Sequence, residues 1–139
     1  MKKYLIILIS GMLFAACSEK TELTEENIAG VWNAKEFEST IPNIPAEYQE
    51  AGKQEFLSSV YTLNKDNSFE LRSSFFVNGA FGRWEFDPET RELSMFYEMD
   101  TTHGVEKFNI TALTATSMTL RQDIPSMSAF VQLELERSK

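Results

Sequence analysis

The chain has 139 residues, of which 42% are hydrophobic, and its 13 Lys and Arg against 21 Asp and Glu give a formal net charge of −8. This acidic balance argues against binding to nucleic acid and against electrostatic adhesion to anionic lipid, because both need clustered Lys and Arg. The one Cys excludes a disulfide within the chain. The length suits one domain of ordinary size rather than two.

Residues 1–16 have the three regions of an export signal: a basic start, an apolar run over 4–14, and the small pair Ala15 and Ala16 before Cys17. The apolar run is too short to span a membrane, which takes about 20 residues. We therefore predict that 1–16 is a cleaved signal helix and exclude it from the fold. It contains two Lys and no acids, so the remaining 123 residues carry a formal charge of −10.

The segment 13–17, Leu-Phe-Ala-Ala-Cys, resembles the lipobox of bacterial lipoproteins, with Phe14 in place of the usual aliphatic residue. In that family the Cys is acylated, with chains such as palmitate, and the peptide is cut just before it. The resemblance implies that Cys17 is the lipidation site and that its acyl chains hold the protein to a membrane of the cell envelope. Ser18 directly after the Cys implies the outer membrane. The alternative is an ordinary secreted protein with a free thiol.

Residues 17–29 are mostly polar and are expected to form a flexible lipidated tether, which could reach roughly 40 Å when fully extended. Within it, residues 24–28 could form a single helical turn with Thr24 as its N-cap.

From residue 30 to 137 the dominant period is two, which predicts a meander of β-strands. Eight runs are expected, at about 30–38, 56–64, 68–77, 80–87, 91–98, 104–112, 116–122 and 128–137. Short turn-rich links make neighbouring strands antiparallel, and eight such strands close most simply into an up-and-down barrel without exposed edges. The fold class is therefore all-β. A longer connection over 39–55 could hold a short helix from Pro45 to Gly52 and act as a lid over one mouth of the barrel.

Alternation assigns one apolar and one polar face to the strands. The polar face carries residues such as Glu70, Arg83 and Glu134. The apolar face carries the aromatic residues Phe69, Phe75, Trp84, Phe86, Tyr97 and Phe108, together with aliphatic and Met residues.

The triplet Gly30-Val31-Trp32, after a helical turn and before a long loop, resembles the start of the first strand in the lipocalin superfamily. The likeness covers roughly 28–137 and is nearest to the short lipocalin-like domains found behind bacterial lipoprotein signals. It implies that Trp32 plugs the closed end of the barrel, with an Arg from a late strand packed on it. Arg137 is the positional candidate for that Arg and Arg121 is its rival. The Thr-Asp-Tyr motif of larger lipocalins is absent.

Two interpretations of the barrel interior remain open. A cavity could bind a small apolar or amphipathic ligand against Phe75, Trp84, Phe86, Tyr97 and Phe108, since ligand pockets are mainly apolar. Alternatively, these side chains fill the interior, and the protein is a structural or protein-interaction lipoprotein without a ligand. Eight short strands enclose a space just wide enough for side chains or one small ligand, which slightly favours the filled interior.

Catalysis, cofactors and metals have little basis in the sequence. The chain has one His, no nucleophile elbow and no phosphate-binding loop, so we expect it not to be an enzyme and to hold no cofactor. Acidic pairs such as Glu85 with Asp87 are better explained by a solvated surface. Met95, Met99 and His103 could bind Cu(I), but a strand would scatter them over about 25 Å, so no metal is expected.

Overall fold

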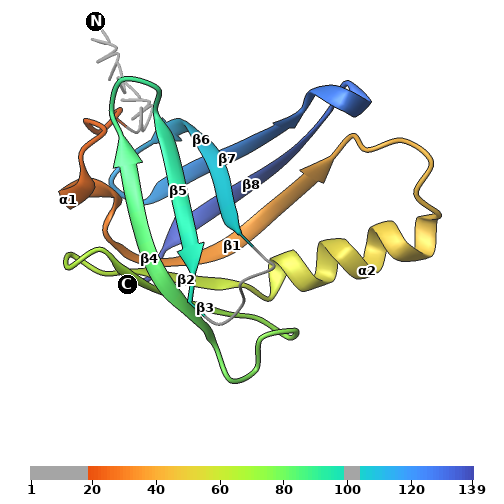
Figure 1. The fold of residues 1–139 in the computed structure, drawn as a ribbon, viewed down its shortest axis with the longest axis horizontal. Coiled ribbons are helices and arrows are strands. Elements are labelled where there is room, and N and C mark those ends of the chain that lie inside the picture. The colour runs from red at the N-terminus through yellow and green to blue at the C-terminus, as the bar shows by residue number, and fades with distance from the viewer. Residues whose placement is uncertain (1–18, 99–103) are drawn as a thin grey trace, which may run out of the picture.

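A computed structural model describes residues 19–98 and 104–139, which form one β-barrel with two helices beside it (Figure 1). The strands pair in sequence order and β1 pairs with β8, so the sheet closes on itself. All eight pairings are antiparallel, which confirms the predicted all-β up-and-down barrel. The elements are α1 (Glu25–Ile28), β1 (Gly30–Ser39), α2 (Ala46–Leu57), β2 (Val60–Leu63), β3 (Ser68–Arg72), β4 (Ala80–Asp87), β5 (Glu92–Tyr97), β6 (Val105–Leu113), β7 (Ser117–Ile124), the 3-10 turn η1 (Pro125–Met127) and β8 (Ala129–Arg137).

Alternation and turn chemistry explain the strands. In β4 every second residue, from Ala80 to Phe86, is buried, and the residues between them are exposed. The turn between β2 and β3 is fixed by Asp66, whose Oδ1 accepts a hydrogen bond from the Ser68 backbone N–H at 2.9 Å. Asn67 takes the left-handed conformation in this turn, with φ of 65°, which Asn adopts more readily than most residues.

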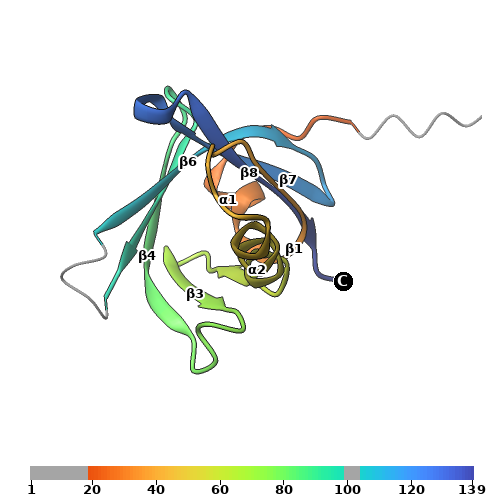
Figure 2. The same ribbon diagram turned by 90° about the vertical axis from the view of Figure 1, so that its right-hand side faces the viewer.

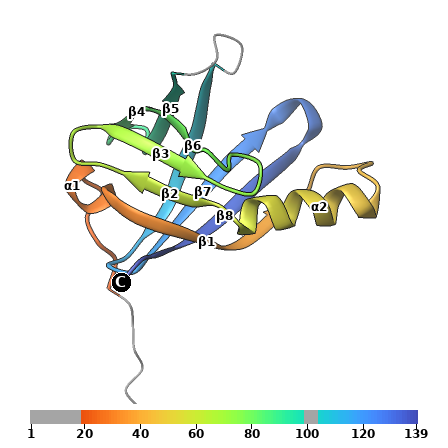
Figure 3. The ribbon, with the colours of Figure 1, turned by 90° about the horizontal axis from the view of Figure 1, so that it is seen from below.

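The two ends of the barrel differ. At one end α1 covers the opening, where Ile28 and Trp32 are fully buried. α2 lies at the opposite end and projects beyond the strands (Figure 3). Figure 2, which views α2 along its axis, shows it beside β1. The barrel is therefore closed at the α1 end and bordered by α2 at the other.

Two strand boundaries differ from the prediction by four or five residues. β2 begins at Val60 rather than near 56, because α2 continues through Gly52 to Leu57. β3 ends at Arg72 rather than near 77, and residues 73–79 form a loop instead. Both differences lie at the end of the barrel that α2 borders.

The N-terminal segment packs on the closed end. The predicted helical turn is confirmed as α1, with Thr24 accepting a hydrogen bond from the Asn27 N–H at 3.3 Å. Lys20 forms an isolated β-bridge with Thr114, and the Thr21 N–H donates to the Leu113 carbonyl at 2.9 Å. Where the sequence suggested a tether over 17–29, the structure therefore places 20–29 against the barrel.

The strands and the core cluster lie between residues 28 and 137, so the chain from Glu19 onward contains a complete barrel. Within the part of the chain that the structure describes, no helix has both the length and the apolar character needed to cross a membrane.

Candidate functional site

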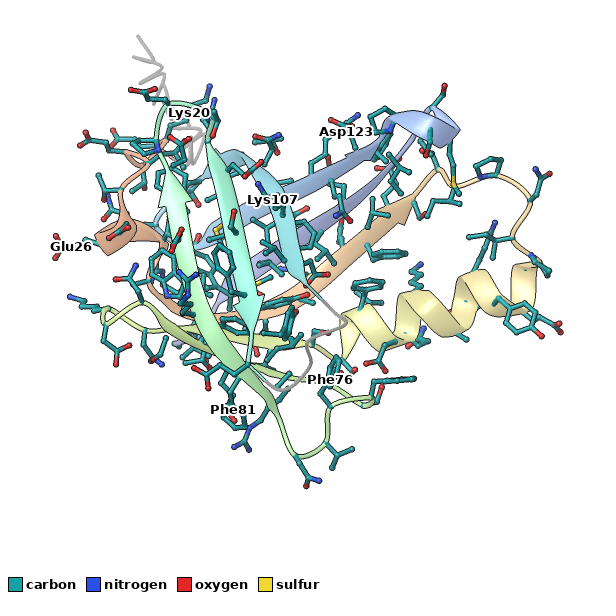
Figure 4. All side chains as sticks on the ribbon, in the orientation of Figure 1. Lys20, Glu26, Phe76, Phe81, Lys107 and Asp123 are labelled. Carbon is teal, nitrogen blue, oxygen red and sulfur yellow. The ribbon has the colours of Figure 1, made fainter. Side chains whose placement is uncertain are left out.

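A cavity of about 570 Å³ opens at the α2 end of the barrel. Its wall is built from the last turn of α2, the adjoining ends of β2 to β7, and the loop over 73–79. Most of this wall is apolar, and its apolar side chains are Phe56, Leu71, Phe75, Phe76, Ala80 and Val105. Figure 4 shows Phe76 between this loop and the end of α2.

Aromatic packing fixes the position of two wall elements. The rings of Phe56 on α2 and Phe37 on β1 stack with centroids 4.6 Å apart, which holds the end of the helix against the first strand. On the opposite side, the rings of Phe69 and Tyr97 pack edge to face, with their centroids 5.1 Å apart. Gly82 pairs with Tyr97 across β4 and β5, and a Cβ at Gly82 would clash first with the backbone carbonyl of Phe96 and would also lie 2.8 Å from the Phe69 ring. The missing side chain therefore leaves room for this aromatic pair.

A hydrogen-bonded polar pair lies in the mostly apolar wall. The Tyr97 hydroxyl donates a hydrogen bond to Oε2 of Glu106 at 2.6 Å. Burial raises the pKa of Glu106 above its ordinary value, although the Tyr97 hydrogen bond acts in the opposite direction. Burial likewise raises the pKa of Tyr97 and of Tyr61, so both stay neutral at physiological pH. The cavity thus offers hydroxyl and carboxyl groups within an apolar surface.

Glu55, near the end of α2, holds the loop over 73–79 at the rim of the cavity. Its carboxylate accepts hydrogen bonds from the hydroxyls of Ser73 and Ser74 and, at 3.0 Å, from the Phe75 backbone N–H. Desolvation tends to raise the pKa of Glu55, but these hydrogen bonds outweigh it and lower the pKa overall. Glu55 is therefore an ionised acid at the rim.

The five aromatic residues expected to contact a ligand do not all reach the cavity. Tyr97 and Phe75 line it. Trp84, Phe86 and Phe108 are buried in the core and are not part of its wall. Trp84 instead donates its indole N–H to the Asn64 carbonyl at 3.0 Å. The filled interior that was the alternative thus describes these three side chains.

The placement of Phe75 on the apolar face of a strand was wrong. The residue lies in the loop after β3, and its side chain is 81% exposed. It borders the cavity because Glu55 binds its backbone, and alternation along β3 has no part in this.

Three ionisable residues of the cavity wall were not predicted from the sequence: Glu55, Tyr61 and Glu106. A signal for Glu106 was present, because it lies two residues before Phe108 and so shares the inward side of β6. Tyr61 shares a side of β2 with the buried Leu63 in the same way. Glu55 left no such signal, since its role depends on a loop 18 to 20 residues away in the sequence.

At the closed end, Trp32 is fully buried and donates its indole N–H to the Ile28 carbonyl at 2.8 Å. The guanidinium carbon of Arg137 lies 4.2 Å from the centre of the Trp32 ring. Arg121, the rival, lies over Phe130 instead, at 3.9 Å. The structure thus places Arg137 on the ring expected to plug the barrel.

The structure describes three of the residues that the sequence offered for acid-base or metal chemistry: Glu85, Asp87 and Met95. Glu85 forms an ion pair with Arg83, and Asp87 accepts hydrogen bonds in the turn after β4. Among residues 19–98 and 104–139 no group of three or more His, Cys, Asp or Glu is placed to hold a metal ion. Met95 is fully buried in the core. Met99, His103 and Cys17 lie outside the described residues.

No protein-family model matches the chain, and no curated protein matches its sequence.

Proposed function

We propose that the protein is a membrane-anchored lipoprotein of the cell envelope, with a lipocalin-like barrel that binds a small apolar or amphipathic molecule. The cavity at the open end is the observation that carries this proposal. Its volume of about 570 Å³ falls in the range of small-molecule sites, and such sites typically combine apolar walls with a few polar groups. The protein acts by binding and not by catalysis, and needs no cofactor.

The anchor is supported by the sequence pattern that ends at Cys17. Acyl chains on that residue would hold the protein to the outer membrane, since several buried chains give a durable attachment. Thr21 is fixed to Leu113 at the closed end, so the four peptide steps from Cys17 span at most about 14 Å. The closed end then lies near the membrane and the cavity opens away from it.

Binding is tested with the chain from Glu19 onward and N-phenylnaphthylamine, a neutral probe whose fluorescence rises in apolar surroundings. Ala80 lines the cavity, so Ala80→Phe fills part of it. Ala112 is exposed on β6, and Ala112→Phe is the matched control. We expect the wild type and Ala112→Phe to take up the probe and Ala80→Phe to lose most of this uptake. Equal uptake by all three, or by none, would contradict the proposed site.

The anchor is tested by labelling cells with palmitate. The full chain should incorporate label and fractionate with the outer membrane, whereas Cys17→Ser should do neither. Label retained by Cys17→Ser would exclude lipidation at this residue.

A second candidate is a structural or protein-interaction lipoprotein. It is favoured by the exposed apolar side chains of Phe75 and Val77, which are 81% and 76% exposed beside the cavity. Exposed apolar patches of this kind can mark protein contacts. This candidate would replace the first if the wild-type barrel takes up no probe.

A further inference from the structure

Among the described residues of the cavity wall, every ionisable side chain is either acidic or neutral. Glu55 and Glu106 are the acids, Tyr61 and Tyr97 are the other two ionisable groups, and none of the described lining residues is Lys or Arg. Nearby cations are engaged on the outer face, where Arg72 pairs with Glu70 and Lys107 pairs with Glu92. A ligand in the cavity therefore meets a negative or neutral surface.

An anionic ligand would find no positively charged partner among the described residues of this surface. A carboxylate or phosphate that enters a partly buried site must give up water, and this is costly without a cation to replace it. The ionised Glu55 at the rim would repel it further, and the field between like charges is stronger where water is partly excluded.

A cationic headgroup fits the same surface. A protonated amine has three donors and no acceptor, and Glu106 and Tyr97 present acceptor oxygens within an apolar wall. Hydrogen bonds between an ammonium and a carboxylate are among the stronger ones in proteins. We infer that the cavity selects an amphiphile with a protonated amine, which pairs with Glu106 while its apolar part packs against Phe56 and Leu71.

This inference rests on the proposed function, because it names the ligand class of the same cavity. It also predicts a coupling to pH. Glu106 has a raised pKa, so in the empty cavity it keeps its proton to a higher pH than an ordinary Glu, whereas pairing with an ammonium favours its ionised form. Among the residues that the structure describes, the other ionisable groups that face the cavity keep their charge between the ordinary Glu pKa and physiological pH, since Glu55 is ionised and both tyrosines are neutral. Amine affinity should therefore rise as the pH rises from the ordinary Glu pKa of 4.5, and it should level off above the raised pKa of Glu106.

The test is displacement of N-phenylnaphthylamine from the chain that starts at Glu19, by dodecylamine, dodecanol and dodecanoate. These probes share one apolar chain and differ only in the headgroup. We expect dodecylamine to bind at least about tenfold more tightly than dodecanoate, with dodecanol between them. Glu106→Gln should remove the preference of the amine over the alcohol, and the exposed Glu134→Gln on β8 should keep it.

The outcomes separate the two proposals. If the wild type does not bind N-phenylnaphthylamine, the proposed function fails. If the probe binds but dodecanoate displaces it as well as dodecylamine does, the ligand class is wrong and the cavity remains a binding site. An amine preference that survives in Glu106→Gln would also overturn the inference. The comparison of dodecylamine with dodecanoate uses the wild type alone, so it remains decisive even if Glu106→Gln does not fold.

Discussion

The guanidinium of Arg137, at the end of the last strand, lies over the ring of Trp32 in the first strand, with 4.2 Å from its central carbon to the ring centroid. It also donates hydrogen bonds to the carbonyls of Ala29 at 2.9 Å and Asn27 at 2.6 Å. A single side chain thus joins the two strands that close the barrel to the segment that covers its end.

Arg137→Ala should lower the free energy of unfolding by about 2–3 kcal/mol, because it removes a cation-π contact and several charge-assisted hydrogen bonds. Urea denaturation of the chain from Glu19 measures this. Arg121→Ala is the matched control, since Arg121 stacks on Phe130 and pairs with the exposed Asp123, and it should cost less than about 1 kcal/mol. Equal costs for the two variants would contradict the assigned role of Arg137.

Gly30→Ala should destabilise the protein by about 1–3 kcal/mol. Gly30 has a φ of 151°, and a Cβ there would lie 2.3 Å from Nη1 of Arg137. Gly52 lies in α2 with open space around its Cβ position, so Gly52→Ala should instead stabilise by about 0.5–1 kcal/mol. Thermal and urea unfolding measure whether stability falls in Gly30→Ala and rises in Gly52→Ala. A Gly30→Ala variant as stable as wild type would refute the tight packing of Arg137.

Ionisation of the buried Glu106 should lower the free energy of unfolding as the pH rises. Because its pKa is raised in the folded state, the native protein binds more protons than the unfolded chain above the ordinary Glu pKa of 4.5. The loss should begin near that pH and level off above the raised pKa. Glu106→Gln should flatten this part of the pH profile and become more stable than wild type at neutral pH. A parallel profile for Glu106→Gln would disprove the burial of this acid.

Glu55→Ala should free the loop over 73–79 from α2. The Phe75 N–H donates to the Glu55 carboxylate, so its exchange with deuterium should become about tenfold faster, which is a loss of about 1.4 kcal/mol of protection. Glu47→Ala, in the first turn of the same helix, should leave this exchange as it is. No change in Glu55→Ala would show that the loop keeps its position by other contacts.

The sequence was sufficient for the barrel because period-two patterning and turn residues are local signals. β4 illustrates this, since its alternation from Arg83 to Asp87 matches the observed burial residue by residue. α2 was harder, because Gly52 resembles a helix end but lies within the helix. The helix continues to Leu57, and its last turn packs Phe56 on Phe37 from another element.

The candidate site was only partly predictable. Alternation tells which side of a strand a residue faces and not how deep it lies along the barrel. Phe108 and Glu106 share the inward side of β6, yet Phe108 is in the core and Glu106 is in the cavity wall. Phe75 reaches the rim through Glu55, a contact that no local pattern encodes.

Native mass spectrometry shows whether the open end of this barrel holds a small molecule. The Cys17→Ser chain, exported but not lipidated, would be recovered from the cell envelope and compared with the same chain carrying Ala80→Phe or Ala112→Phe. We expect a one-to-one small-molecule adduct on the Cys17→Ser chain and on its Ala112→Phe variant, and no adduct on its Ala80→Phe variant. A bare protein mass in all three, with no uptake of N-phenylnaphthylamine by the wild type, would contradict this expectation.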